Sequence, residues 1–192
     1  MVTDRERWNE RWADLRVDDE PEPPGVLVES AALLPAPGRA VDLAGGLGDA
    51  ALWLAQRGWQ VTLVDVADVA LDRAQERAQR LGVSIDTERV DLEQDPPPAG
   101  PWDLIVVSHY LHRPLLAQLP ERLRPNGVVV VGIATMTNLE RHPKPSARFL
   151  LDDDELPQLL PGSRVIRHLE DWSPWGVHES RLVAGRSSDG LS

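Results

Sequence analysis

The sequence predicts an α/β protein built on a mostly parallel, doubly wound sheet of about seven strands, with an antiparallel strand near the C-terminus. From residue 39 to residue 133, short β-rich runs alternate with helical stretches, which is the spacing of strand–helix–strand units with right-handed crossovers. Beyond residue 160, two β-rich runs follow one another with only a turn between them. Because strands joined by a turn run antiparallel, these runs are expected at the end of the sheet.

The expected elements follow from the apolar runs and from the glycines and prolines that end them. Strands are expected at residues 39–43, 59–64, 83–90, 102–107, 128–133, 163–169 and 177–185. Helices are expected at residues 49–57, 68–81, 113–123 and 152–160, with a turn at 125–127. The run at 102–107 is apolar almost throughout, as in strands that are buried on both faces.

The N-terminal part has a different character. Residues 1–37 are expected to be a helical segment with a proline-rich linker, residues 38–186 the main domain, and residues 187–192 a tail. A first helix is expected to begin at Thr3 or Asp4 and to pack one face on the domain through Trp8, Trp12 and Leu15. Acidic residues and prolines at 18–25 predict a linker or surface loop, and a second short helix is expected over about 26–34.

Composition limits the function classes. The chain of 192 residues contains no cysteine, which excludes disulfides, thiolate metal sites and cysteine nucleophiles. The histidines have no helical i, i+4 pairing, so no metal site is expected. The N-terminus is polar and no apolar run reaches the ~18 residues that span a bilayer, so we expect a soluble, cytoplasmic protein without a membrane partner.

The charge balance bears on the partners. With 31 acidic residues against 20 lysines and arginines, the formal net charge is −11. An acidic surface repels phosphate backbones, and the sequence has no dense basic run. A small-molecule substrate is therefore expected rather than a nucleic acid, whereas the oligomeric state is left open.

Acidic and small polar residues stand at the carboxyl ends of the expected parallel strands. The first strand ends at Asp42 and a glycine-rich turn, the second at Asp65, the third at Asp91, and the fourth at residues 108–110. Each acid alone has an ordinary explanation as a helix cap or a solvated group. Because ligands bind beyond these strand ends, the convergence of several acids on one edge favours a nucleotide-like ligand.

These residues carry a family resemblance. The sequence resembles the class I S-adenosylmethionine-dependent methyltransferases, in particular the small bacterial group of tellurite-resistance and ubiquinone-biosynthesis-like enzymes. The matching segments are 41–48, 64–65, 90–92, 102–107 and 123–128, and residues 8–12 are similar to the aromatic-flanked N-terminal helix of that group. The resemblance covers about residues 38–134 and implies a Rossmann-like fold.

The resemblance also implies roles in binding S-adenosylmethionine. Asp42 would orient the glycine-rich turn or contact the methionine amino group, and Gly46 and Gly48 would let the backbone approach the cofactor. Asp65 would take the ribose hydroxyls. Ala44 stands where the family has its first glycine, and its methyl group is expected to crowd the carboxypropyl end of the cofactor.

Further cofactor-binding positions follow from the same resemblance. Asp91 would accept the adenine amino group, Leu92 would lie against the ring, and Val66 and Ser108 complete the expected set. His109 and Tyr110, the catalytic candidates, would lie near the transferred methyl group.

Methyl transfer is an in-line displacement, so the protein mainly holds the acceptor and the methyl group in line. A base is needed only if the acceptor loses a proton, and His109 is the best-placed candidate. A structural histidine is an equally good explanation of His109, and Tyr110 fits a pocket wall and the core equally well. Arg113 and the basic loop at 141–148 could face an anionic substrate or be ordinary surface features, and His178 is expected to be structural.

The sequence therefore predicts an S-adenosylmethionine-dependent methyltransferase acting on a small-molecule acceptor. One alternative is a non-catalytic adenosylmethionine-binding module, since Ala44 departs from the motif and no motif activates a nucleophile. A weaker alternative is an NAD(P)-dependent oxidoreductase, because Gly46, Gly48 and Ala51 satisfy the loose dinucleotide pattern and Asp65 fits both ligands.

Overall fold

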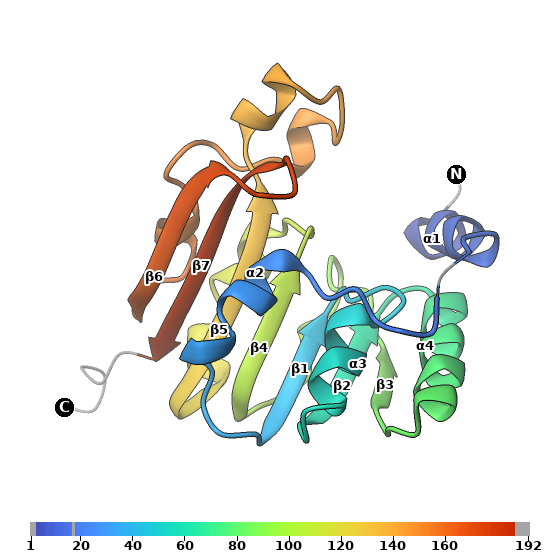
Figure 1. Ribbon diagram of the computed structural model, residues 1–192. Coiled ribbons are helices and arrows are strands. Elements are labelled where there is room, and N and C mark those ends of the chain that lie inside the picture. Colours follow the sequence, from blue (N-terminus) through green and yellow to red (C-terminus); the bar gives the residue numbers. More distant parts are fainter. Residues whose placement is uncertain (1–2, 17, 187–192) are drawn as a thin grey trace.

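The computed structural model describes residues 3–16 and 18–186, so the expected tail at 187–192 lies outside the described residues. One seven-stranded sheet forms the centre of the molecule, as predicted (Figure 1). Its strands are β1 (Arg39–Leu43), β2 (Gln60–Asp65), β3 (Asp86–Arg89), β4 (Trp102–Ser108), β5 (Leu123–Ala134), β6 (Ser163–Trp172) and β7 (His178–Arg186).

The strand order is β3-β2-β1-β4-β5-β7-β6. The first five strands in this order pair in parallel, whereas β7 is antiparallel to both β5 and β6. The predicted antiparallel strand is thus confirmed, although β7 lies inside the sheet and β6 forms the edge. Because β1 to β5 are parallel, their carboxyl ends meet at one edge of the sheet.

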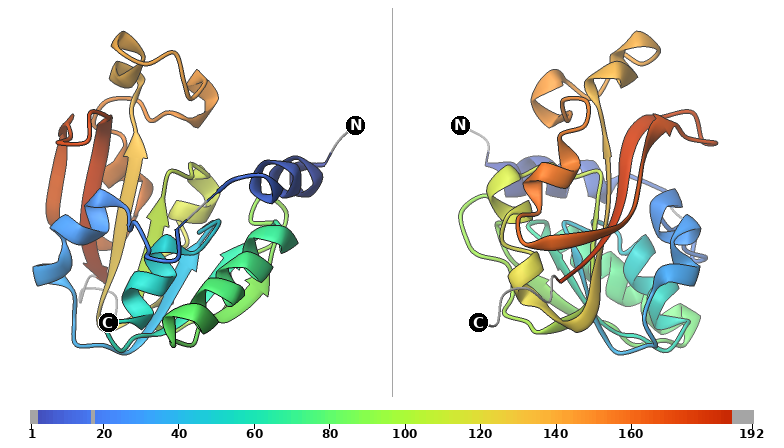
Figure 2. Two further views of the ribbon diagram at one scale, coloured as in Figure 1. Left: turned by 45° about the vertical axis from the view of Figure 1, so that its right-hand side comes forward. Right: turned by 90° about the vertical axis from the view of Figure 1, so that its left-hand side faces the viewer.

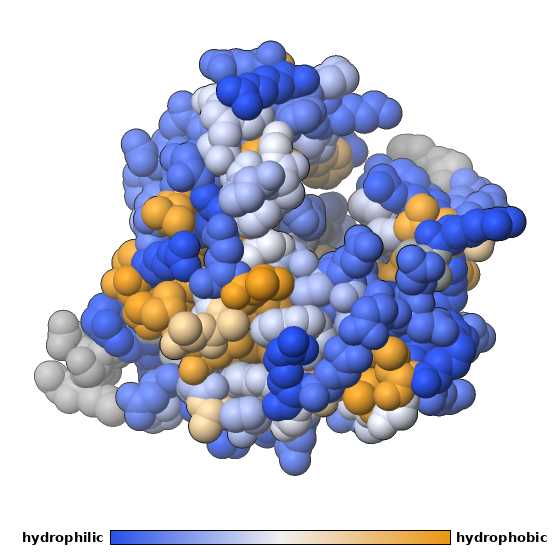
Figure 3. Space-filling view, viewed as in Figure 1, coloured by the Kyte–Doolittle hydropathy of each residue, from blue (hydrophilic) through white to orange (hydrophobic). Residues whose placement is uncertain are grey.

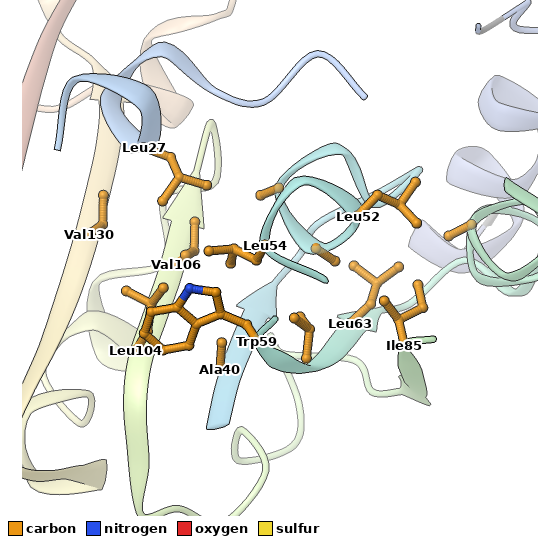
Figure 4. Packing of buried hydrophobic residues seen from close by; sticks show 14 of the residues in the cluster. Leu27, Ala40, Leu52, Leu54, Trp59, Leu63, Ile85, Leu104, Val106 and Val130 are labelled. Atoms are coloured by element: carbon orange, nitrogen blue, oxygen red, sulfur yellow. The ribbon is translucent and has the colours of Figure 1, made fainter. Parts of the chain in front are cut away.

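Two hydrophobic layers cover the two faces of the sheet. On one face lie α2 (Gly25–Glu29), α3 (Asp49–Ala55) and α4 (Asp68–Leu81). Figure 4 shows Leu27 of α2 and Leu54 of α3 converging on Val106 of β4, with Trp59 beside them. The other face is covered by α5 (Arg113–Leu116) and by the segment 150–160, whose leucines pack on β4 and β5.

Prolines shorten the helices expected on this second face. The helix expected at 113–123 ends at Leu116 and gives way to the 3₁₀ turn η2 (Pro120–Arg122), since proline removes an N–H and clashes with the preceding turn. The helix expected at 152–160 is wrong: only the 3₁₀ turn η5 (Leu156–Leu159) forms. Asp154 there adopts a φ of 60°, which a right-handed helix cannot contain.

Smaller differences concern strand limits and turns. The strand expected at 83–90 is shortened to β3 at its beginning, and the turn expected at 125–127 lies within β5, where Asn126 has a φ of 67°. The second short helix splits into α2 and the 3₁₀ turn η1 (Ala31–Leu33). Two further 3₁₀ turns, η3 (Met136–Glu140) and η4 (Ala147–Phe149), follow β5.

Helix α1 (Asp4–Ala13) lies at the carboxyl edge of the sheet, against the start of α4 (Figures 1 and 2). Thr3 and Glu6 form a capping box at its first turn. Trp8 and Trp12 pack against the domain as predicted, whereas Leu15 is 44% exposed and does not belong to that contact. Within the described residues, no helix is long and apolar enough to cross a membrane.

Candidate cofactor site

A cavity of about 90 Å³ lies at the carboxyl edge between α1 and the ends of β1, β2 and β4. Of the residues predicted for the site, it brings together Ala44, Asp65, Val66, Asp91, Leu92, His109 and Tyr110. The cavity is also lined by five residues that were not predicted from the sequence: Asp4, Trp8, Trp12, Val90 and Glu93. Of the predicted residues, Asp42, Gly46, Gly48 and Ser108 do not line this cavity.

The glycine-rich turn that follows β1 is held in an unusual backbone conformation. Gly46 and Gly48 have φ angles of 55° and 79°, and Ala44 has a φ of 54°. A left-handed conformation costs a residue with a side chain roughly 1–2 kcal/mol relative to glycine. Ala44 thus keeps the conformation that a glycine would adopt there, and its methyl group stands at the cavity wall.

Asp65 connects the ends of two elements around the cavity. Its Oδ2 accepts the N–H of Gly46 at 2.8 Å, and its Oδ1 accepts the N–H of Ala67 at 2.9 Å. Burial raises the pKa of the Asp65 carboxyl, and backbone hydrogen bonds from Ala67, Gly46 and Val66 oppose the rise. Each carboxylate oxygen has a second lone pair, so the group retains acceptor capacity for a ligand hydroxyl.

Asp42 lies behind the turn rather than in the cavity. Its side chain is buried, and neither carboxylate oxygen has a hydrogen-bond partner among the described residues. Burial raises the pKa of Asp42 to about 7, and the charges of Asp65 and Asp49 add to the effect. A Cβ at Gly45 would come within 2.4 Å of Asp42 Oδ2, so the carboxyl group directly supports the turn.

This buried carboxyl group makes stability depend on pH. The folded chain keeps the Asp42 proton up to about pH 7, whereas the unfolded chain releases it near its ordinary pKa of 3.8. The free energy of unfolding is therefore expected to fall between about pH 4 and about pH 7, since each unit of pKa difference is worth about 1.4 kcal/mol. Asp42→Asn should reduce this fall, measured by urea unfolding across that range.

A second buried carboxyl group and a control variant bear on how the pH dependence of Asp42→Asn is interpreted. Burial also raises the pKa of Glu179 to about 7, so the variant should retain part of the slope and not become flat. Asp72→Asn removes a carboxyl group from the exposed side of α4 and serves as the charge-matched control. An Asp42→Asn profile that runs parallel to the wild type would show that Asp42 is ionised in the folded protein.

His109 and Tyr110 follow β4 and line the cavity next to each other. His109 has a φ of 56°, and its backbone N–H donates to the carbonyl oxygen of Gly132 at 2.8 Å. The residue is exposed, but neighbouring groups still desolvate the imidazole ring and lower its pKa. Burial raises the pKa of Tyr110, with Glu93 and Asp91 adding to the rise, so its hydroxyl group stays protonated.

The residues that follow β3, 90–93, form another wall of the cavity. Asp91 Oδ1 accepts the N–H of Glu93 at 3.1 Å, which closes the turn after β3 and holds that carboxyl group in place. Leu92 is buried and presents an apolar surface to the cavity. Acidic and apolar groups therefore lie side by side on this wall.

Helix α1 closes the cavity from outside through Asp4, Trp8 and Trp12. The two indole rings are stacked with centroids 5.7 Å apart, and a Cβ at Gly46 would lie 3.0 Å from Trp12. Trp12 Nε1 is buried without a partner among the described residues. The aromatic spacing in the sequence predicted the packing of this helix, but its place over the turn comes from the tertiary structure.

Other candidates from the sequence have structural partners instead. Arg113 forms a two-pronged ion pair with Glu155, at 2.5 and 2.8 Å. His178 Nδ1 lies 2.8 Å from the Thr135 hydroxyl group, and His142 Nε2 lies 2.8 Å from the carbonyl oxygen of Gly176. None of these three candidates lines the cavity.

Comparison with known proteins gives one family match and one curated relative. Residues 40–127 match the family described as a methyltransferase domain. The ribosomal RNA small subunit methyltransferase C of Alcanivorax borkumensis is 33% identical over 103 residues, which cover 48% of this chain. The match spans 31% of the length of that relative.

Solved structures share the fold at low identity. TehB from Haemophilus influenzae superimposes with a TM-score of 0.71 at 16% identity, covering 95% of this chain and 67% of TehB. A TehB-like S-adenosylmethionine-dependent methyltransferase from Corynebacterium glutamicum superimposes with a TM-score of 0.61 at 20% identity. The match covers 95% of this chain and 98% of that protein. The matched domain includes the glycine-rich turn, Asp65 and Asp91. Residues 40–127 of this chain therefore match a methyltransferase domain, and the chain shares its fold with TehB and with the TehB-like S-adenosylmethionine-dependent methyltransferase.

Proposed function

We propose that the protein transfers the methyl group of S-adenosylmethionine to a small-molecule acceptor that binds beside His109 and Tyr110. The observation that carries this proposal is the convergence of Ala44 in the glycine-rich turn, Asp65, Asp91 and His109 on one cavity at the carboxyl edge of the sheet. The cofactor supplies a methyl group that is already activated on a sulfonium. The residues of the protein therefore bind, orient and exclude water, and need not form a covalent bond.

The lining suits the two ends of adenosine. Asp65 accepts the ribose hydroxyls with the lone pairs that Gly46 and Ala67 leave free. Asp91 accepts the adenine amino group, while Leu92 and Val66 contact the ring. Asp42 acts from behind by supporting the turn, and this role replaces direct contact with the methionine amino group.

The cavity is smaller than its proposed occupant. Ligand pockets commonly measure about 300–1,000 Å³, against about 90 Å³ here. The wall formed by Trp8 and Trp12 belongs to α1, which lies apart from the sheet, so outward movement of this helix would enlarge the cavity. In Figure 3 the surface is hollowed between α1 and the segment after β5, which gives an acceptor a route to the same edge.

The charges around the cavity bear on the acceptor. Asp4, Asp65, Asp91 and Glu93 line it, whereas no lysine or arginine appears among its described lining residues. Such a wall repels phosphates and carboxylates and supports a neutral or cationic acceptor. His109 is uncharged at neutral pH because desolvation lowers its pKa, so it can take the proton that an acceptor loses.

The test is incubation with methyl-labelled S-adenosylmethionine and fractionated small metabolites, with ribosomal RNA as a separate arm because of the similarity to a ribosomal RNA methyltransferase. Label in a small-molecule fraction is expected, and it should be absent with heat-denatured protein. Label in RNA alone would overturn the proposed acceptor class. Cofactor binding with no transfer to any fraction would favour a non-catalytic binding module. In a separate measurement of the denaturation temperature, stabilisation by NAD and not by S-adenosylhomocysteine would overturn the cofactor assignment.

A further inference from the structure

Arg77 is a charged residue in the interior of the protein. It belongs to α4, and its side chain is only 2% exposed. A buried guanidinium group is costly unless other groups satisfy its hydrogen bonds. The partners of Arg77 therefore indicate what this residue is retained for.

Those partners come from separate segments of the chain. Arg77 Nη1 donates to the carbonyl oxygen of Leu47, inside the glycine-rich turn, at 2.9 Å. Nη2 donates to the carboxylate of Asp49, the first residue of α3, at 2.8 Å and to the carbonyl oxygen of Glu20 at 3.5 Å. The same Asp49 oxygen accepts the N–H of Glu22 at 3.2 Å.

Glu20 and Glu22 belong to the segment that joins α1 to α2, which passes α4 and crosses α3 in Figure 1. We call residues 12–16 and 18–22 the N-terminal strap. Two neighbours of Arg77 on the same side of α4 also hold the strap. Arg73 donates to the carbonyl oxygens of Trp12 and Leu15, and Arg80 pairs with Asp19 at 2.7 Å.

Arg77 differs from both neighbours because it also reaches the cofactor turn. The Arg80–Asp19 pair is about half exposed on each side, and such surface pairs contribute little. Leu47, whose carbonyl oxygen Arg77 holds, packs its side chain with Trp8 and Trp12 of α1. The turn is thus fixed from behind by Arg77 and covered in front by α1.

We propose that Arg77 is a positioning residue that couples docking of the N-terminal strap to the shape of the cofactor-binding turn. Release of the strap would remove the Glu20 and Glu22 contacts, loosen the Arg77–Asp49 pair and free the Leu47 carbonyl oxygen. A cofactor held by the turn would in the same way favour the docked strap, since coupling between two sites is reciprocal. This inference rests on the proposed function only in taking the turn as the cofactor site.

The test compares Arg77→Met with Arg80→Met in the full chain. Hydrogen exchange of the strap and of residues 44–49 should accelerate strongly in Arg77→Met and little in Arg80→Met. Binding of S-adenosylhomocysteine, measured by calorimetry, should weaken by roughly tenfold in Arg77→Met, the size expected when a buried carbonyl oxygen loses a charged donor. In the wild type, S-adenosylhomocysteine should slow exchange in the strap, and this protection should be lost in Arg77→Met.

Further variants separate positioning from simple loss of stability. Arg77→Lys keeps the charge but reaches fewer acceptors, so it should restore part of the affinity, and Asp49→Asn should uncouple the strap from ligand binding even if Arg77→Met fails to fold. Wild-type affinity in folded Arg77→Met or Asp49→Asn, with strap protection intact, would overturn the coupling. If the wild type itself does not bind S-adenosylhomocysteine, the proposed function fails, while exchange in the ligand-free variants still decides whether Arg77 holds strap and turn together.

Discussion

Asp65→Asn is expected to weaken binding of S-adenosylmethionine by about tenfold to about 100-fold. A hydrogen bond to a charged group is worth roughly 1.5–3 kcal/mol, and the variant exchanges a doubly accepting carboxylate for an amide with one acceptor oxygen. The amide must also turn its NH₂ group toward the N–H of Gly46 or of Ala67, which leaves one of these donors unsatisfied. Titration calorimetry on the folded variant measures the change in affinity.

The control for this measurement is Asp86→Asn. Asp86 is an exposed carboxyl group at the start of β3, whereas the cavity lies beyond the carboxyl ends of the strands. The Asp86→Asn variant loses the same charge as Asp65→Asn and should bind the cofactor with wild-type affinity. Equal affinity in Asp65→Asn and Asp86→Asn would mean that Asp65 serves only the backbone of the turn.

The parallel part of the fold could be predicted because its signals are local. Apolar runs stop at glycines that end helices in left-handed conformations, such as Gly58 and Gly82. The helix limits at 68–81 agree with α4 at both ends. Where prolines interrupt a helical pattern, the prediction failed, because Pro120 and Pro157 favour single 3₁₀ turns over the longer helices that the remaining residues would form.

The carboxyl edge was predictable for a topological reason, since parallel strands bring their ends together whatever their side chains are. To predict which face of the sheet a side chain points to, the alternation along the strand must also be considered. Val41 and Leu43 face the layer that contains α5, so the alternation of a strand turns Asp42 toward the other face. That alternation could have shown that Asp42 lies under the turn and does not line the cavity.

The contribution of α1 could not be derived in this way. Helix α1 meets the cavity through tertiary contacts across about sixty residues of sequence, such as the one between Asn9 and Val69. For Arg77, however, a signal was present: it continues the buried stripe formed by Ala70, Ala74 and Ala78 on α4. A charged residue in an apolar helical stripe indicates a buried partner, here the carbonyl oxygen of Leu47.

Gly45→Ala tests the support of the cofactor turn most directly. The φ of Gly45 lies outside the left-handed region, so an alanine is acceptable to the backbone there and only the added methyl group matters. That methyl carbon would lie 2.4 Å from Asp42 Oδ2 and 2.5 Å from Leu63 Cδ1, in a buried environment where neither neighbour can withdraw freely. Overpacking of this kind typically costs about 1–3 kcal/mol of stability, which chemical unfolding measures.

The matched control is Gly185→Ala in β7, where the new methyl carbon would meet its nearest neighbours at 3.5 Å, an ordinary contact. The Gly185 variant should keep stability and cofactor affinity, whereas the Gly45 variant should lose both, because the turn must move away from Asp42 and carries the N–H of Gly46 away from Asp65. Loss of stability with unchanged affinity would mean that the core absorbs the strain by moving Leu63. Loss of affinity with unchanged stability would mean that the turn itself moves. Cofactor affinity would then depend on how closely Gly45 packs against Asp42.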